Sequence, residues 1–272
     1  MNIVTNYQER LYNRVDKSTI DTFPRTLMLL GEFGCGKHTL VNYIANKFKF
    51  EVEDISDNIT LELLDDISTR PIPKIYIIES DKLNTRNENV ILKFLEEPMK
   101  NAYIILLVER KEYIIQTVVN RCQVWEFEGY PIGYLDTLIP ESHPNRAELL
   151  LVANTPGKVQ KYQSYPISDM IDLANRMFLN MCRANIANAL TLGRHLAFKN
   201  EKDKFDFNLF CDILVITLHK LIMENKLEWY TDWFAVYSLT SELNHDKYIH
   251  NVDKKALFDK YIITLKKMVS VR

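Results

Sequence analysis

Residues 26–39 read TLMLLGEFGCGKHT, and this stretch decides the fold class. A short apolar run at 26–30 predicts a buried strand, and apolar side chains on one face of 37–48 predict an amphipathic helix. Between them lie three of the chain's 7 glycines: Gly31, Gly34 and Gly36. A glycine-rich turn between a strand and a helix can wrap phosphates with its backbone N–H groups. The stretch therefore predicts a phosphate-binding loop, with Lys37 directed at the outer phosphates.

The loop departs from the usual pattern directly after its lysine. Ser or Thr normally follows and ligates magnesium, whereas this chain has His38, with Thr39 one residue later. One helical residue rotates a side chain by about 100°. The next strong strand ends in Glu79-Ser80-Asp81, where Glu79 can serve magnesium but Ser80 cannot polarise water as a carboxylate does. We expect ATP or ADP to meet the glycines, Lys37, His38, Thr39 and Glu79, with little hydrolysis; a loop that keeps its shape without using nucleotide is the alternative.

Short apolar runs alternate with amphipathic segments up to residue 128, which predicts an α/β core with a parallel sheet and helices on both faces. The expected strands are 26–30, 50–55, 74–78, 103–108 and 123–127, and the expected helices are 37–48, 59–67, 87–97 and 112–119. Five of the 9 prolines fall between 131 and 166, which indicates a boundary region. Beyond Pro166 the apolar residues recur every three or four positions, which predicts an all-helical part.

Composition excludes several classes of protein. The 272 residues are 47% hydrophobic, and a formal net charge of −2 gives no global basic field for nucleic acid. The 4 cysteines lie far apart, so we expect no zinc module. No targeting signal or membrane-length apolar run is visible, so we expect a cytoplasmic protein. HExxH and GxSxG patterns are absent and Cys35 has no evident base, which disfavours a zinc hydrolase or a covalent nucleophile.

Four segments together resemble AAA+ clamp-loader subunits, most closely the delta-prime type of bacterial DNA polymerase III. They are the glycine loop 31–39, KIYIIE at 74–79, LKFLEEP at 92–98 and VNRCQ at 119–123. The last two resemble the family's LLKxLEEP and SRC motifs in the same order. In addition, Asn251-Val-Asp253 resembles the family's C-terminal Asn-Val-Asn.

The resemblance implies three parts: an AAA+ P-loop core at 1–128, a small helical lid at 129–165 and a helical collar at 166–272, through which subunits assemble in a ring. It implies gamma/tau-type ATPase and delta-type subunits as partners, together with the sliding clamp and primer-template DNA, and no membrane. In such rings the arginine of the SRC motif reaches the phosphates bound by the next subunit. That role carries over to Arg121, with Asn120 in place of the serine; a structural salt bridge is the alternative.

The departures from the family weaken hydrolysis by the chain itself. Val108 stands where an ATPase usually has a polar residue that senses phosphate, and the magnesium hydroxyl is missing. Lys158 lies where an arginine usually reads phosphate, although a solvated lysine at a helix start is the alternative. The family's four-cysteine zinc module is also absent. These losses favour a delta-prime-like stator, a part of the polymerase III holoenzyme with little or no ATPase of its own.

Two other functions stay open. One is a self-sufficient P-loop ATPase, such as a phage or mobile-element clamp loader, in which Lys37, Thr39 and Glu79 turn over ATP. The other is an adaptor with a relict nucleotide fold and no arginine finger. An aromatic segment at 229–237 predicts helix packing, and the basic C-terminal segment predicts a solvated helix face, so no residue is assigned to DNA.

Overall fold

The chain forms two units in the computed structural model. One unit comprises Met1–Pro131 and Thr155–Lys158, and the other comprises Ile132–Asn154 and Val159–Arg272. The structure describes residues 7–83, 85–96, 101–181, 185–197, 206–224, 226, 232–247 and 252–269. Glu97, Pro98, Trp229, Tyr230 and Asn251, which the sequence singles out, lie outside these ranges.

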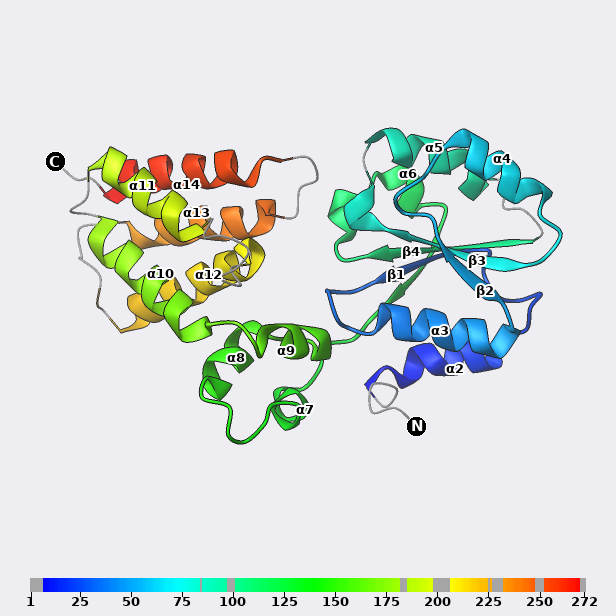
Figure 1. The fold of residues 1–272 in the computed structure, drawn as a ribbon, viewed down its shortest axis with the longest axis horizontal. Helices are drawn as coiled ribbons and strands as arrows, with labels where there is room; N and C mark the ends of the chain where they lie inside the picture. Colours follow the sequence, from blue (N-terminus) through cyan, green and yellow to red (C-terminus); the bar gives the residue numbers. More distant parts are fainter. Residues whose placement is uncertain are drawn as a thin grey trace. The chain divides into compact units, whose positions relative to one another are not determined.

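A parallel sheet forms the centre of the first unit (Figure 1). Its strand order is β2-β3-β4-β1-β5. The strands are β1 (Thr26–Leu30), β2 (Glu51–Asp54), β3 (Lys74–Glu79), β4 (Ala102–Val108) and β5 (Gln123–Glu126). Every expected strand is present to within one residue at each end, and the predicted α/β fold class is confirmed. Because β1 lies between β4 and β5, the loop that follows it opens at the carboxyl edge of the sheet, where α/β proteins place ligands.

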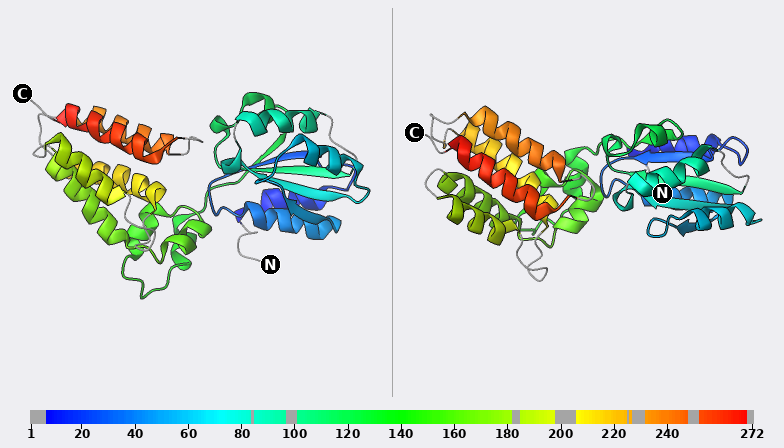
Figure 2. Two further views of the ribbon diagram at one scale, coloured as in Figure 1. Left: turned by 45° about the horizontal axis from the view of Figure 1, so that its top comes forward. Right: turned by 90° about the horizontal axis from the view of Figure 1, so that it is seen from above.

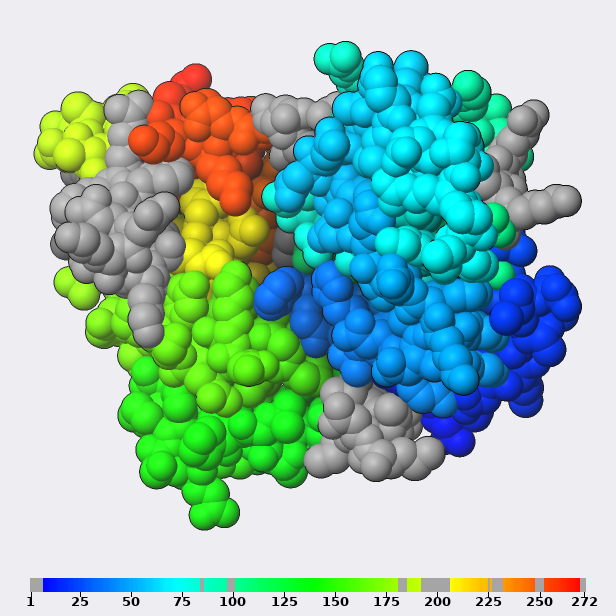
Figure 3. Space-filling view, turned by 45° about the vertical axis from the view of Figure 1, so that its right-hand side comes forward, coloured from blue at the N-terminus to red at the C-terminus, as the bar shows by residue number. Residues whose placement is uncertain are grey.

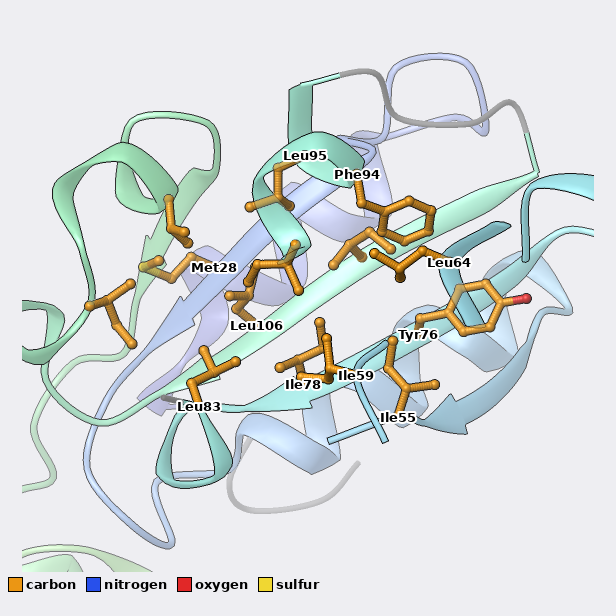
Figure 4. Packing of buried hydrophobic residues seen from close by; sticks show 14 of the residues in the cluster. Met28, Ile55, Ile59, Leu64, Tyr76, Ile78, Leu83, Phe94, Leu95 and Leu106 are labelled. Carbon is orange, nitrogen blue, oxygen red and sulfur yellow. The ribbon is translucent and has the colours of Figure 1, made fainter. Parts of the chain in front are cut away.

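Helices cover both faces of this sheet (Figure 1). One face carries α4 (Leu61–Thr69), α5 (Thr85–Glu96) and α6 (Gln116–Val119), and the other carries α2 (Glu9–Lys17) and α3 (Lys37–Phe48). Figure 4 shows the core under the first face, where side chains of three neighbouring strands pack against α5. They include Met28, Ile78 and Leu106 from the strands and Phe94 and Leu95 from α5. Strands buried on both faces explain why the sequence shows continuous apolar runs.

The expected helix at 112–119 is wrong in its first half. The chain forms a 3-10 turn η2 (Lys111–Tyr113), passes through extended backbone at Ile114 and Ile115, and only then begins α6. The amide of Ile115 donates to Glu88 Oε1 over 3.1 Å, and Ile114 is buried in the core. The hydrogen bond of Ile115 to Glu88 and the burial of Ile114 therefore favour extended backbone at these two residues, and the helix begins only at Gln116.

The described part of the second unit is helical, as predicted. Its helices are α7 (Ile132–Thr137), α8 (Arg146–Val152), α9 (Pro156–Tyr162), α10 (Ile167–Met181), α11 (Ile186–Ala197), α12 (Phe207–Met223), α13 (Trp233–Asp246) and α14 (Lys254–Val269). The first residues of α9 belong to the first unit. Helix α12 packs against α10 and α13, and α14 packs against α11 and α13 (Figure 2).

A buried ion pair joins two helices of the second unit. The Lys247 side chain is 0% exposed, and its Nζ donates to Asp212 Oδ1 over 2.6 Å.

The surface of this unit includes Phe234 of the aromatic segment, which is 81% exposed. The helices of this unit fill the green-to-red part of the space-filling view (Figure 3). None of the helices described is long and apolar enough to cross a membrane.

Candidate functional site

The glycine loop keeps a backbone that only glycine adopts readily. Gly34 has φ 74° and Gly36 has φ 107°, both in the left-handed region. Gly36 is also the N-cap of α3. A Cβ added to Gly31 would lie 2.7 Å from Cys35 Sγ. The three glycines are therefore required by the path of the chain from β1 into α3.

Lys37 is turned back onto this loop. Its Nζ donates to the carbonyl oxygen of Gly31 and, over 3.1 Å, to that of Glu32. A lysine that serves a phosphate at this position reaches toward the β- and γ-phosphates. In the structure Lys37 instead closes the loop on its own carbonyls.

A short segment from the start of α9 lies directly against the loop. The amide of Gly157 donates to Gly34 O over 3.0 Å, and Thr155 Oγ1 donates to Phe33 O over 2.7 Å. The approach is so close that a Cβ on Gly157 would lie 2.3 Å from Gly34 Cα. We call this contact of residues 33–34 with residues 155–157 the seam. The two backbone segments can approach this closely because each has a glycine at the point of contact.

Carboxylates surround the two lysines that the sequence assigns to phosphate. Lys158 has a side chain only 9% exposed, so it is not solvated, and its Nζ forms an ion pair with Glu32 Oε2. Burial raises the pKa of Glu109, while the charges of Lys37 and Lys158 oppose that rise. Sequence reasoning missed Glu32 and Glu109. Their positions, inside the glycine loop and directly after β4, place them at the carboxyl edge and could have pointed to them.

Two of the residues expected near magnesium, His38 and Glu79, contact each other. His38 Nε2 lies 2.9 Å from Glu79 Oε1, and Thr39 is half-buried on α3. Ser80 is buried, whereas Asp81 is exposed. Within the described ranges no group of three His, Cys, Asp or Glu could hold a metal ion. In the observed arrangement Lys37 and His38 are both bonded within the chain, to loop carbonyl oxygens and to Glu79.

Arg121 lies just after α6, where its amide donates to Val118 O over 3.1 Å and three further hydrogen bonds hold it. Its carbonyl oxygen accepts from Thr26 Oγ1 over 2.7 Å. Its guanidinium donates through Nη1 to Thr117 O over 2.8 Å and through Nη2 to Glu96 Oε1 over 2.5 Å. The arginine side chain is 33% exposed, so a group arriving from outside can reach it.

Arg121 and the glycine loop lie at opposite ends of β1. Thr26 is the first residue of β1, and Leu27 pairs with Gln123, two residues after Arg121. The loop follows Leu30 at the other end. At about 3.3 Å per residue, β1 separates the two by about 16 Å, which is more than an arginine side chain can span. The structure thus gathers the loop glycines, Lys37, His38, Glu79 and Lys158 at one edge and leaves Arg121 at the other.

Comparison with known proteins places this core. The profile of a family described as "DNA polymerase III, delta subunit" matches residues 35–131. The DNA polymerase III subunit delta' of Bacillus subtilis is 36% identical over 80 residues, which is 28% of this chain and 24% of the relative. That of Haemophilus influenzae is 35% identical over 51 residues, 19% of this chain and 16% of the relative. The matches therefore span a quarter or less of these relatives.

Among solved structures, the chain is similar to a DNA polymerase III gamma subunit-related protein of Thermotoga maritima. The match covers 97% of this chain and 99% of the other at 14% identity, with a TM-score of 0.48. We draw no conclusion from so distant a likeness. Over residues 35–131 the chain is similar to the DNA polymerase III delta subunit family, and in sequence it resembles subunits named delta'.

Proposed function

We propose that this chain is a delta-prime-like clamp-loader subunit that donates Arg121 to ATP bound by a neighbouring subunit. The position of Arg121 carries the proposal. It lies about 16 Å from the chain's own glycine loop, measured along β1, and its guanidinium is partly exposed. A phosphate that meets this arginine must therefore come from another molecule. Such an arginine stabilises charge in the transition state of phosphoryl transfer, an effect of about 10³–10⁵ in rate in other systems.

The closed loop supports the stator part of the proposal. Lys37 is bonded to Gly31 and Glu32, the seam lies over Phe33 and Gly34, and His38 is bonded to Glu79. Phosphate binding by Lys37 would require its ammonium to leave the two loop carbonyl oxygens. We therefore expect no hydrolysis, and weak nucleotide binding at most, in the isolated chain.

The partners follow from the proposed role. A gamma/tau-type ATPase subunit would supply the nucleotide that Arg121 meets, and a delta-type subunit, the sliding clamp and primer-template DNA would complete the assembly. Within the complex, this chain would hold its neighbour in place while that neighbour's ATP drives loading of the clamp onto primed DNA.

The test is ATP hydrolysis by the clamp-loader complex reconstituted with this chain and its natural partner subunits. We expect Arg121→Ala to lower kcat by at least tenfold without loss of assembly, because the neighbour's transition state loses a charged donor. Arg10→Ala, which removes an exposed arginine on α2, is the matched control and should hydrolyse at the parent rate.

Either of two results would refute the proposal and favour another function. An unchanged rate for Arg121→Ala in an intact complex would favour the adaptor without a finger. Hydrolysis by the isolated chain that disappears in Lys37→Ala would favour the self-sufficient ATPase.

A further inference from the structure

Helix α5 holds both ends of the segment that presents Arg121. Near its start, the buried Glu88 accepts the amide of Ile115, the N-cap residue of α6, over 3.1 Å. At its end, Glu96 accepts from Arg121 Nη2 over 2.5 Å. Ile91, Phe94 and Leu95 between them are buried in the core cluster that also contains Val118. Helix α5 thus anchors α6 and the following Arg121 to the core of the first unit.

We propose that Glu96 is the positioning residue for Arg121. This inference rests on the proposed function, because it concerns how the finger is aimed. The carboxylate and the Thr117 carbonyl fix the guanidinium from two sides. Together these bonds use two of the five N–H donors of an arginine, so three stay available for phosphate oxygens. The side chain can be held and still bind in the forked geometry that arginine uses with phosphate.

Exposure separates this role from a stabilising one. Glu96 is 50% exposed and Arg121 33% exposed, and ion pairs this open to solvent add little to the stability of a fold. They can still restrict rotamers. An unrestrained arginine must lose side-chain freedom when it meets a phosphate, which costs binding in the transition state. Removal of the carboxylate should therefore act on the rate of the neighbour and leave the unfolding of this chain unchanged.

The experiment uses the same reconstituted complex with Glu96→Ala and Glu96→Gln. We expect Glu96→Ala to lower kcat about three- to tenfold with KM for ATP unchanged, because the finger acts in the transition state. Glu96→Gln should recover most of the rate, since its amide oxygen can still accept from Nη2. Glu112→Ala, an exposed glutamate of η2, is the control. In the Arg121→Ala background, Glu96→Ala should change nothing further.

The outcomes distinguish the two ideas. If Arg121→Ala is slow and Glu96→Ala is as fast as the parent, the positioning role is refuted and the proposed function stands. If Glu96→Ala lowers the residual rate equally in the Arg121→Ala complex, or shifts the unfolding midpoint, Glu96 has a structural role and the inference is overturned. If Arg121→Ala itself is fast, the proposed function fails and the inference with it.

Discussion

The seam between the glycine loop and α9 can be opened with a single methyl group. In Gly157→Ala the new Cβ would lie 2.3 Å from Gly34 Cα, whereas ordinary contacts of a Cβ begin near 3.4 Å. The two backbones must therefore separate by about 1 Å, and neither side offers a flexible side chain that can move instead. Gly157 is in the first turn of α9 without a positive φ, so alanine suits its own backbone. The added methyl group therefore clashes only across the seam, with the backbone of Gly34.

The expected loss follows from the bonds that cross the seam. Two hydrogen bonds, from Gly157 N and Thr155 Oγ1, contribute about 1 kcal/mol each. We therefore expect Gly157→Ala to lower the free energy of unfolding of the first unit by about 2 kcal/mol. The Lys158–Glu32 ion pair adds little to this figure, because Glu32 is 40% exposed.

Native-state hydrogen exchange measures the opening directly. A loss of about 2 kcal/mol corresponds to about 30-fold faster exchange of the amide of residue 157, at about 1.4 kcal/mol per tenfold. Gly133→Ala is the matched control, because no atom beyond its chain neighbours and the backbone of its own helix lies within 4 Å of the added Cβ. It should stabilise α7 slightly. If the amide of residue 157 exchanges in the Gly157→Ala chain at the parent rate, the seam is refuted.

Three further perturbations test other parts of the structure. Asp212→Asn should cost the second unit about 2–4 kcal/mol in urea unfolding, because it leaves the buried Lys247 ammonium without its carboxylate. Glu109→Gln should stabilise the first unit at pH 7, because the raised pKa of Glu109 means that its ionised form opposes folding. The stability of the parent should fall as pH rises from about 4.3, the pKa of an unperturbed glutamate, through the raised pKa. The stability of the variant should not show this fall. Burial raises the pKa of Cys211 to about 12, so native chain at pH 8 should resist alkylation at Cys211, as peptide mass spectrometry would show, until urea unfolds it.

The sheet could be predicted closely because its signals are local. Each strand is an apolar run bounded by polar or turn residues, and helix α3 repeats apolar positions after a glycine that can serve as its N-cap. The phosphate loop could be recognised for the same reason. In contrast, the error at 112–119 came from Glu88, more than 20 residues away, whose carboxylate caps α6 at Ile115. No periodicity in the segment itself carries that information.

The state of the loop could not be predicted because distant residues set it. Thr155 and Lys158 lie 122 and 126 residues from their partners Phe33 and Glu32. Sequence analysis left two roles open for Lys158, to read phosphate or to lie in solvent, and its buried side chain contradicts the second. Its ammonium is buried against a carboxylate because the chain returns to the loop at α9.

The two ends of β1 explain how one function can decay without the other. The charges of Lys37 and Lys158 both act on the pKa of Glu109. Changes at the carboxyl edge are therefore coupled to one another. The side chain of Arg121 is bonded to Thr117 and Glu96, and its carbonyl oxygen to Thr26 at the other end of β1. Sites separated by more than about 10 Å without shared partners act nearly independently. We therefore expect substitutions at the carboxyl edge to leave the geometry of Arg121 at the other end intact, which the proposed role toward a neighbour's nucleotide requires.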